Sequence, residues 1–111
     1  MIFFREADLA ARQVRDGITL RALSGDRAML TIFTFEPHAV IPSHEHAHEQ
    51  ITYVVEGELE FTVEGETRLL KAGDGVVILS HQEHSARVLG KPAKAVDAWH
   101  PMRDDYREGQ S

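Results

Sequence analysis

Three histidines, His44, His46 and His48, stand at alternate positions within residues 43–50. In an extended segment, alternate side chains point to the same face, so the three imidazoles would lie together. Neutral imidazoles that converge on one point are good ligands for a divalent transition metal. The spacing alone is more typical of an exposed, histidine-rich loop. A metal site therefore requires a further ligand from elsewhere in the chain.

His84, which follows the apolar run 76–79, is the candidate for that further ligand. With it, the chain resembles the cupin family. The first cupin motif is Gly-x5-His-x-His-x3–4-Glu-x6-Gly, and the second is Gly-x5-Pro-x-Gly-x2-His-x3-Asn. Both motifs occur here in order and at the expected separation. The residues that match them, with Gln in place of the motif Glu, are His44, His46, Gln50, Gly57, Gly73 and His84.

The resemblance implies that one divalent transition metal (Ni, Mn, Fe, Co or Zn) is held by His44, His46, Gln50 and His84. Because all four are neutral, the ion would keep its full charge of +2, where the usual Glu would reduce it to +1. The result is a stronger Lewis acid for an anionic substrate. His48 falls in the variable loop of the motif, where it is either a competing ligand or a residue at the rim.

Other departures from the motifs concern turns and strand ends. His38 and His81 stand at two motif glycines, Leu79 at the proline and Val88 at the asparagine. Other residues can serve at such positions at some cost in backbone strain. These four changes leave the ligand positions intact.

Asp97 and Trp99 share a face of the last predicted strand. If that face lines the barrel, a carboxylate lies beside the metal site, and a buried carboxylate is costly unless it is paired or functional. The alternative is that Asp97 faces solvent and Trp99 packs at an edge. Arg103, taken by itself, is simply a charge in the tail.

A more specific resemblance is to the compact KdgF-type cupins, the pectin-degradation proteins of uronate catabolism. The matching parts are residues 44–58, the metal histidine before a small residue, and a terminal Asp-x-aromatic-x-Pro-x-Arg-x-Asp-aromatic segment over residues 97–106. The resemblance implies that Asp97 is the acid and base and that Trp99 and Arg103 contact substrate. Trp99 replaces the family's usual Phe, which leaves the size of the pocket open.

Short runs separated by turn residues predict about eight strands and hardly any helix, which indicates a β-sandwich or small barrel. With the resemblance, we expect an all-β fold of the cupin type, a double-stranded β-helix or jelly-roll barrel. One domain over residues 1–111 would comprise an N-terminal arm (1–16), the barrel (17–100) and a charged tail (101–111) that ends in a mobile stretch. Residues 6–16 look weakly helical or irregular, without chemistry. The predicted strands cover residues 18–23, 28–35, 51–55, 58–63, 67–71, 76–79, 85–89 and 93–99.

Composition narrows the classes of function. The 111 residues carry 12 Lys and Arg against 18 Asp and Glu, a formal net charge of −6, so nucleic acid is not an expected partner. The absence of Cys excludes disulfides, thiolate metal sites and a cysteine nucleophile. No apolar run is long enough for a secretory signal or a membrane span. We expect a soluble, cytoplasmic protein without membrane contact and, by resemblance, a homodimer.

Three functions are compatible with these residues. The first, implied by the KdgF resemblance, is conversion of 4,5-unsaturated hexuronates, small anionic sugars from pectin or alginate, to linear 5-keto-4-deoxyuronate. The second is an Fe(II)-dependent cupin dioxygenase, in which open metal positions bind O₂ and substrate. The third is a cupin that binds a small molecule without turnover.

Overall fold

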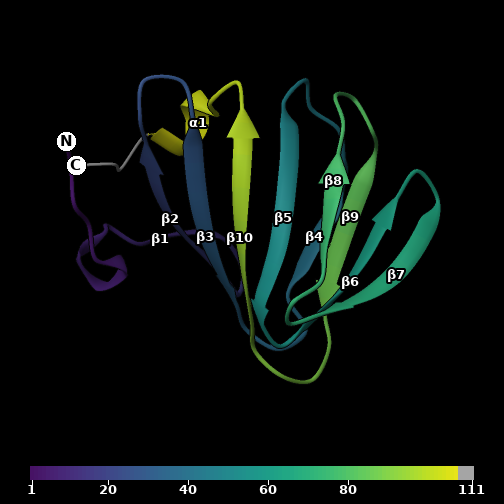
Figure 1. Cartoon of the computed structure of the whole chain (residues 1–111). Helices are drawn as coiled ribbons and strands as arrows, with labels where there is room; N and C mark the ends of the chain where they lie inside the picture. The colour runs from purple at the N-terminus through teal and green to yellow at the C-terminus, as the bar shows by residue number, and fades with distance from the viewer. Residues whose placement is uncertain (108–111) are drawn as a thin grey trace.

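The computed structural model describes residues 1–107, and Figure 1 shows that nearly all of its regular structure is strand. A short 3-10 helix, η1 (Glu6–Asp8), comes before the strands and the short helix α1 (Asp104–Arg107) after them. The strands are β1 (Arg12–Arg15), β2 (Ile18–Ser24), β3 (Met29–Phe35), β4 (Val40–His44), β5 (Glu49–Glu56), β6 (Glu58–Val63), β7 (Glu66–Lys71), β8 (Gly75–Ile78), β9 (His84–Val88) and β10 (Ala93–His100).

The strands form two antiparallel sheets. One has six strands in the order β1-β2-β3-β10-β5-β8, and the other has four in the order β4-β9-β6-β7. The two sheets pack as a jelly-roll sandwich, which confirms the predicted all-β fold. β10 lies between β3 and β5 in the larger sheet, with Asp97 opposite Thr31 on one side and Thr52 on the other. The last strand therefore carries its inner side chains into the middle of the molecule.

Alternation of burial along the strands explains why one face of each sheet is covered. In β5 and β10, buried residues occupy every second position through most of the strand, as expected for strands with one face toward the core. The apolar inner side chains include Leu20, Val54, Leu59 and Ile78, each at most 1% exposed. Their removal from water supplies the main driving force for pairing the sheets.

Two strands and a helix were not predicted. β1 lies in the segment expected to be weakly helical or irregular, β4 ends at His44, the first residue of the histidine cluster, and α1 lies in the expected tail. β1 has the sequence Arg-Gln-Val-Arg, which lacks apolar alternation, and it is a strand because it pairs with the edge of β2. The predicted mobile end of the tail lies outside the described residues. Within residues 1–107, neither helix has the length and apolar character needed to cross a bilayer.

Two of the four departures from the cupin motifs at turns and strand ends fall at strained backbone positions. His38 and His81, which replace motif glycines, have φ values of 67° and 62°, a region in which non-glycine residues are uncommon. The expected strain at these turns is thus present. At Gly57, which keeps the motif residue, a Cβ would lie 2.3 Å from the carbonyl oxygen of Pro92. Only glycine fits at that position.

Candidate functional site

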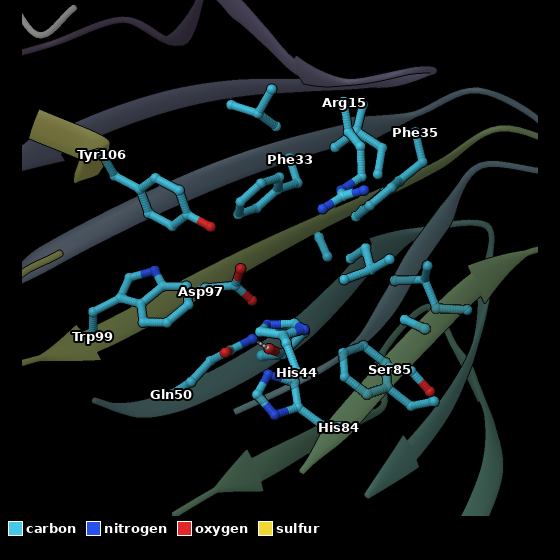
Figure 2. A pocket seen from close by; sticks show the side chains of 18 of the residues that line it. Arg15, Phe33, Phe35, His44, Gln50, His84, Ser85, Asp97, Trp99 and Tyr106 are labelled. Atoms are coloured by element: carbon cyan, nitrogen blue, oxygen red, sulfur yellow. Dashed lines mark hydrogen bonds between the residues drawn. The ribbon is translucent and has the colours of Figure 1, made fainter. Parts of the chain in front are cut away.

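A cavity of about 420 Å³ lies between the sheets, a volume in the range of small-molecule sites. Most of its lining is apolar, and Figure 2 shows the aromatic side chains of Phe33, Phe35 and Tyr106 on one side of it. A few polar groups converge from the other elements. Those labelled in Figure 2 include His44, Gln50, His84 and Asp97. This combination of an apolar wall with few polar groups is typical of a binding or catalytic site.

The three histidines of the cupin motifs form one cluster. His44 ends β4 and His84 begins β9, where the two residues are directly opposite in the ladder. His46 follows in the β4–β5 loop, and its ring centroid lies 4.8 Å from that of His84. One nitrogen from each imidazole lies within 4.8 Å of those of the other two. The fold therefore brings together the ligands that the sequence predicted from distant segments.

Backbone carbonyls fix the orientation of all three rings. Nδ1 of His44 lies 2.9 Å from the carbonyl oxygen of Pro42, Nδ1 of His46 lies 2.9 Å from that of His48, and Nδ1 of His84 lies 2.8 Å from that of Gln82. A carbonyl only accepts, so each Nδ1 must carry the proton and each Nε2 keeps a free lone pair. Metal-binding histidines are commonly oriented in this way.

Gln50 completes the donor set. Its amide nitrogen donates to Oγ1 of Thr52 over 2.9 Å, and its Oε1 faces Nε2 of His46 at 3.1 Å. With Nδ1 of His46 protonated, two acceptor atoms face each other, which is favourable only with a proton or a cation between them. Nε2 of His84 is buried without a hydrogen-bond partner. These residues therefore fit a divalent metal ion.

The cluster also favours the neutral state that a metal requires. Burial lowers the pKa of His46 and of His84, more than their backbone hydrogen bonds raise it, and the nearby charge of Arg103 acts in the same direction as burial. Neutral imidazoles bind a metal without first losing a proton.

The remaining histidines are not part of this cluster, although the ring of His48 lies next to that of His46, with centroids 5.7 Å apart. Among residues 1–107, the only group of three or more potential metal ligands is His44, His46 and His84. His48 instead packs edge-on to Trp99, with ring centroids 6.4 Å apart, and its Nδ1 is buried without a partner. His81 lies 3.6 Å from the carboxylate of Glu45 at the surface. His48 is thus beside the site and outside the group of converging nitrogens.

Asp97 faces the cavity, which is one of the two orientations that the sequence left open. It is 4% exposed, and its Oδ1 has no hydrogen-bond partner. Burial raises the pKa of this carboxyl to about 7, although the side chains of Thr52, Thr31 and Gln50 oppose the rise. A carboxyl with a pKa near neutrality can both release and accept a proton at physiological pH.

Trp99 and Asp97 are linked through a buried threonine. The indole N–H of Trp99 donates to Oγ1 of Thr31 over 2.8 Å, and that hydroxyl lies 3.4 Å from Oδ2 of Asp97. Thr31 is completely buried. Since the hydroxyl accepts from the indole, its own proton is free to point at the carboxylate. Thr31 therefore orients both side chains, and the alternative that Asp97 faces solvent is wrong.

Arg103 lies against the aromatic side of the site. Its guanidinium contacts the carboxylate of Asp105 at 2.8 and 3.0 Å and stacks on the rings of Trp99 and Tyr106, at 5.0 and 4.3 Å from their centroids. Burial raises the pKa of Asp105, but the hydrogen bond and charge of Arg103 outweigh it, so the pKa falls. Arg103 is near the histidines but does not line the cavity. Its predicted contact with substrate stays a prediction.

Several residues of the site were missed from the sequence. Thr31 and Thr52 lie on predicted strands, but no motif marks a threonine beside a carboxylate. Tyr106 was part of the terminal segment and had no assigned role, whereas it packs against Phe33 and Trp99. Arg12 and Arg15 lie in the arm where no chemistry was expected, and both line the cavity. No sequence signal distinguished these two arginines from the other Lys and Arg residues, of which the chain has 12 in all.

Comparison with known proteins agrees with this geometry. The family model described as "Cupin domain" matches residues 31–99. The chain is 29% identical over 106 residues to the pectin degradation protein KdgF of Dickeya dadantii (strain 3937), covering 94% of this chain and 96% of that protein.

Solved structures give the same picture. KdgF from Halomonas sp. superposes with a TM-score of 0.89 at 34% identity, over 95% of this chain and 97% of the other. An RmlC-like cupin from Shewanella frigidimarina NCIMB 400 has a TM-score of 0.88 at 28% identity, over 94% of each chain. On its fold, its two histidine motifs and these matches, the chain belongs to the cupin family and is similar to KdgF over nearly its whole length.

Proposed function

We propose that the protein is a metal-dependent enzyme that converts 4,5-unsaturated hexuronates to linear 5-keto-4-deoxyuronate. The observation that carries the proposal is a buried Asp97, with a pKa of about 7 and one carboxylate oxygen that lacks a hydrogen-bond partner, in the same cavity as His44 and His84 of the three-histidine cluster. Similarity to the KdgF proteins, one of which is named as a pectin degradation protein, supplies the substrate class.

The reaction is an isomerisation that needs two proton movements. The proton of the anomeric hydroxyl leaves, C1 becomes an aldehyde as its bond to the ring oxygen breaks, and the enol released from the ring gains a proton at C4. In this proposal Asp97 accepts the first proton and returns one at C4, a role supported by its pKa of about 7, which allows exchange in either direction near neutral pH. No atom is gained or lost overall.

His44, His46, Gln50 and His84 would hold one divalent transition metal, with Ni, Mn, Fe, Co and Zn all compatible with this donor set. When bound, the ion supplies positive charge that polarises a sugar oxygen. Trp99 forms part of the cavity wall, and Arg103 holds the aromatic groups beside it. We retain both as substrate contacts on the basis of the KdgF resemblance. The homodimer and the cytoplasmic location stay predictions.

The experiment is a comparison of the wild-type protein with Asp97→Ala and Asp97→Asn. The substrate is the unsaturated galacturonate released by a pectate lyase, and its C4=C5 double bond is followed by ultraviolet absorbance. We expect wild-type turnover and a loss of about 10²- to 10⁴-fold in kcat in both variants, the usual contribution of a general acid or base. Metal content per chain should be unchanged.

Three outcomes would contradict the assignment. Unchanged turnover by Asp97→Ala would remove Asp97 from the chemistry. Activity that requires O₂ and iron, measured by oxygen consumption, would favour the dioxygenase instead, whereas full activity under anaerobic conditions with Ni²⁺ or Mn²⁺ would eliminate it. Tight binding of the sugar without turnover would leave a binding protein.

A further inference from the structure

A bulge in β1 brings two arginines to the inner face of the larger sheet. Arg12 pairs with Leu20 and Arg15 with Ile18, both buried residues, and the register shifts between residues 13 and 15. In a regular strand, residues three apart point to opposite faces. The bulge adds one unpaired residue at position 14, so that Arg15 points to the same face as Arg12. Bulges commonly redirect a side chain in this way. Arg12 and Arg15 consequently both line the cavity.

The two arginines differ in what they contact. Arg12 donates to the carbonyl oxygen of Asp105 over 2.6 Å and so ties β1 to the C-terminal segment. Arg15 has neither an ion-pair nor a hydrogen-bond partner within residues 1–107. Figure 2 shows its guanidinium directed into the cavity, on the side that carries Phe33 and Phe35. An apolar wall offers no hydrogen-bond acceptors, so an anion in the cavity would be the natural partner of this group.

A third arginine near the site, Arg103, already has a carboxylate partner. Arg103 makes two short contacts with the carboxylate of Asp105, and this anion would have to be displaced before Arg103 could bind another. Arg15 offers the same planar fork of donors, which matches a carboxylate in a bidentate manner, with no such competitor. In a chain with a net charge of −6, Arg15 and its neighbour Arg12 bring two positive charges to the β1 end of the cavity, and only that of Arg15 lacks a partner.

We propose that Arg15 binds the carboxylate of the sugar and so makes the site selective for uronates over neutral sugars. The sugar itself comes from the proposed function, on which this inference rests. The assignment places the carboxylate at the β1 end of the cavity and leaves the opposite end, with the histidines and Asp97, to the reacting part of the ring.

The test compares Arg15→Gln and Arg15→Lys with the wild type. The matched control is Arg27→Gln, because Arg27 is also exposed and lies in the turn between β2 and β3, away from the cavity lining. Turnover is measured with the unsaturated galacturonate and with its methyl ester, which lacks the charge. Binding of D-galacturonate and of its methyl ester is measured in parallel by calorimetry, so that recognition is read without turnover.

Arg15→Gln should raise KM for the acid about 10- to 100-fold, the range expected for a lost hydrogen bond to a charged group, with little change in kcat. The preference for acid over ester should disappear, and Arg15→Lys should recover part of it. If Arg15 only stabilised the fold, its replacement would not change the ratio of turnover with the acid to turnover with the ester. Arg27→Gln should behave as the wild type.

An acid-to-ester ratio in Arg15→Gln within twofold of the wild-type value would overturn the inference while leaving the proposed function intact. Arg15-dependent binding of galacturonate by a protein that does not turn over the unsaturated sugar would support the inference and reject the proposed function. If the wild-type protein binds acid and ester equally well, Arg15 does not recognise a carboxylate.

Discussion

One side of the cavity is oriented by contacts between residues two apart, and the other by contacts between residues more than sixty apart. The histidine wall (His44, His46 and His84) has each Nδ1 against a carbonyl two positions away. In the β10 wall (Thr31, Asp97 and Trp99), the bonds join residues separated by 66 and 68 positions. The rings of the histidine wall are oriented by their own loops and strand ends, while the side chains of the β10 wall are oriented only when β3 pairs with β10.

The two walls also differ in how burial affects them. In the histidine wall, burial lowers the pKa of His46 and His84 and keeps them neutral. In the β10 wall, burial raises the pKa of Asp97 to about 7. The same physical cause, loss of hydration of the charged form, prepares the bases on one side for a metal and the acid on the other for proton transfer. At neutral pH, burial lowers the free energy of unfolding only through the β10 wall, because Asp97 begins to ionise there and its charged form is poorly hydrated.

The largest effect is expected from breaking the histidine wall. His46→Ala should weaken metal binding by more than about 100-fold, beyond the range for residues that only orient a ligand, and should abolish turnover. His48→Ala, two residues away but outside the cluster, is the matched control and should retain the metal. Titration with Ni²⁺ or Mn²⁺ measures both. Metal loss in His48→Ala and retention in His46→Ala would reverse the ligand assignment.

Asp97→Asn should show how much the buried carboxyl of the β10 wall lowers the free energy of unfolding at neutral pH. Because the folded pKa of about 7 lies above the ordinary value of 3.8, the folded state binds the extra proton. The contribution of Asp97 to stability is therefore present below pH 4 and is lost as pH rises to about 7. In the metal-free proteins, the wild-type minus variant free energy of unfolding should fall by about 3 kcal/mol between pH 5 and pH 8.

Urea unfolding of the two metal-free proteins over this pH range gives the measurement. The histidines are common to both proteins, so their titration cancels in the difference. A difference that stays constant with pH would mean that Asp97 has the same pKa in the folded and unfolded chains, and the acid and base role would lose its physical basis.

Thr31→Val should give a smaller effect that is confined to the β10 wall. The change removes the acceptor of the indole N–H of Trp99 and the hydroxyl beside Asp97. An unsatisfied buried donor costs about 1–3 kcal/mol, and loss of the hydroxyl should raise the pKa of Asp97 further. The pH profile of kcat should move upward accordingly.

The matched control is Thr34→Val on the same strand. Residue 34 is an odd number of positions from residue 31 and so points to the outer face. It should leave the pH profile of kcat unchanged. Equal shifts in the two variants would attribute the effect to the strand as a whole and not to the hydroxyl of Thr31.

The histidine wall could be predicted because its evidence is local. Spacing alone placed His44 and His46 together, and the second motif added His84. Asp97 was predictable up to a choice of face, since alternation in β10 put it with Trp99 on one side or the other of the sheet. Burial selected the inner side. Arg15 was not predictable, because β1 has no apolar pattern and its orientation depends on a bulge against β2.

By itself, the sequence determined an all-β sandwich or small barrel and the face shared by Asp97 and Trp99, because periodicity acts within short segments. Its resemblance to the cupin motifs added the jelly-roll type and the histidine cluster. Only the tertiary structure decided which acceptors orient the imidazoles, that Thr31 joins Trp99 to Asp97, that Asp105 compensates Arg103, and that Arg15 enters the cavity. Charge compensation and burial depend on contacts between segments that are distant in sequence, and local sequence patterns do not predict which of these segments lie side by side.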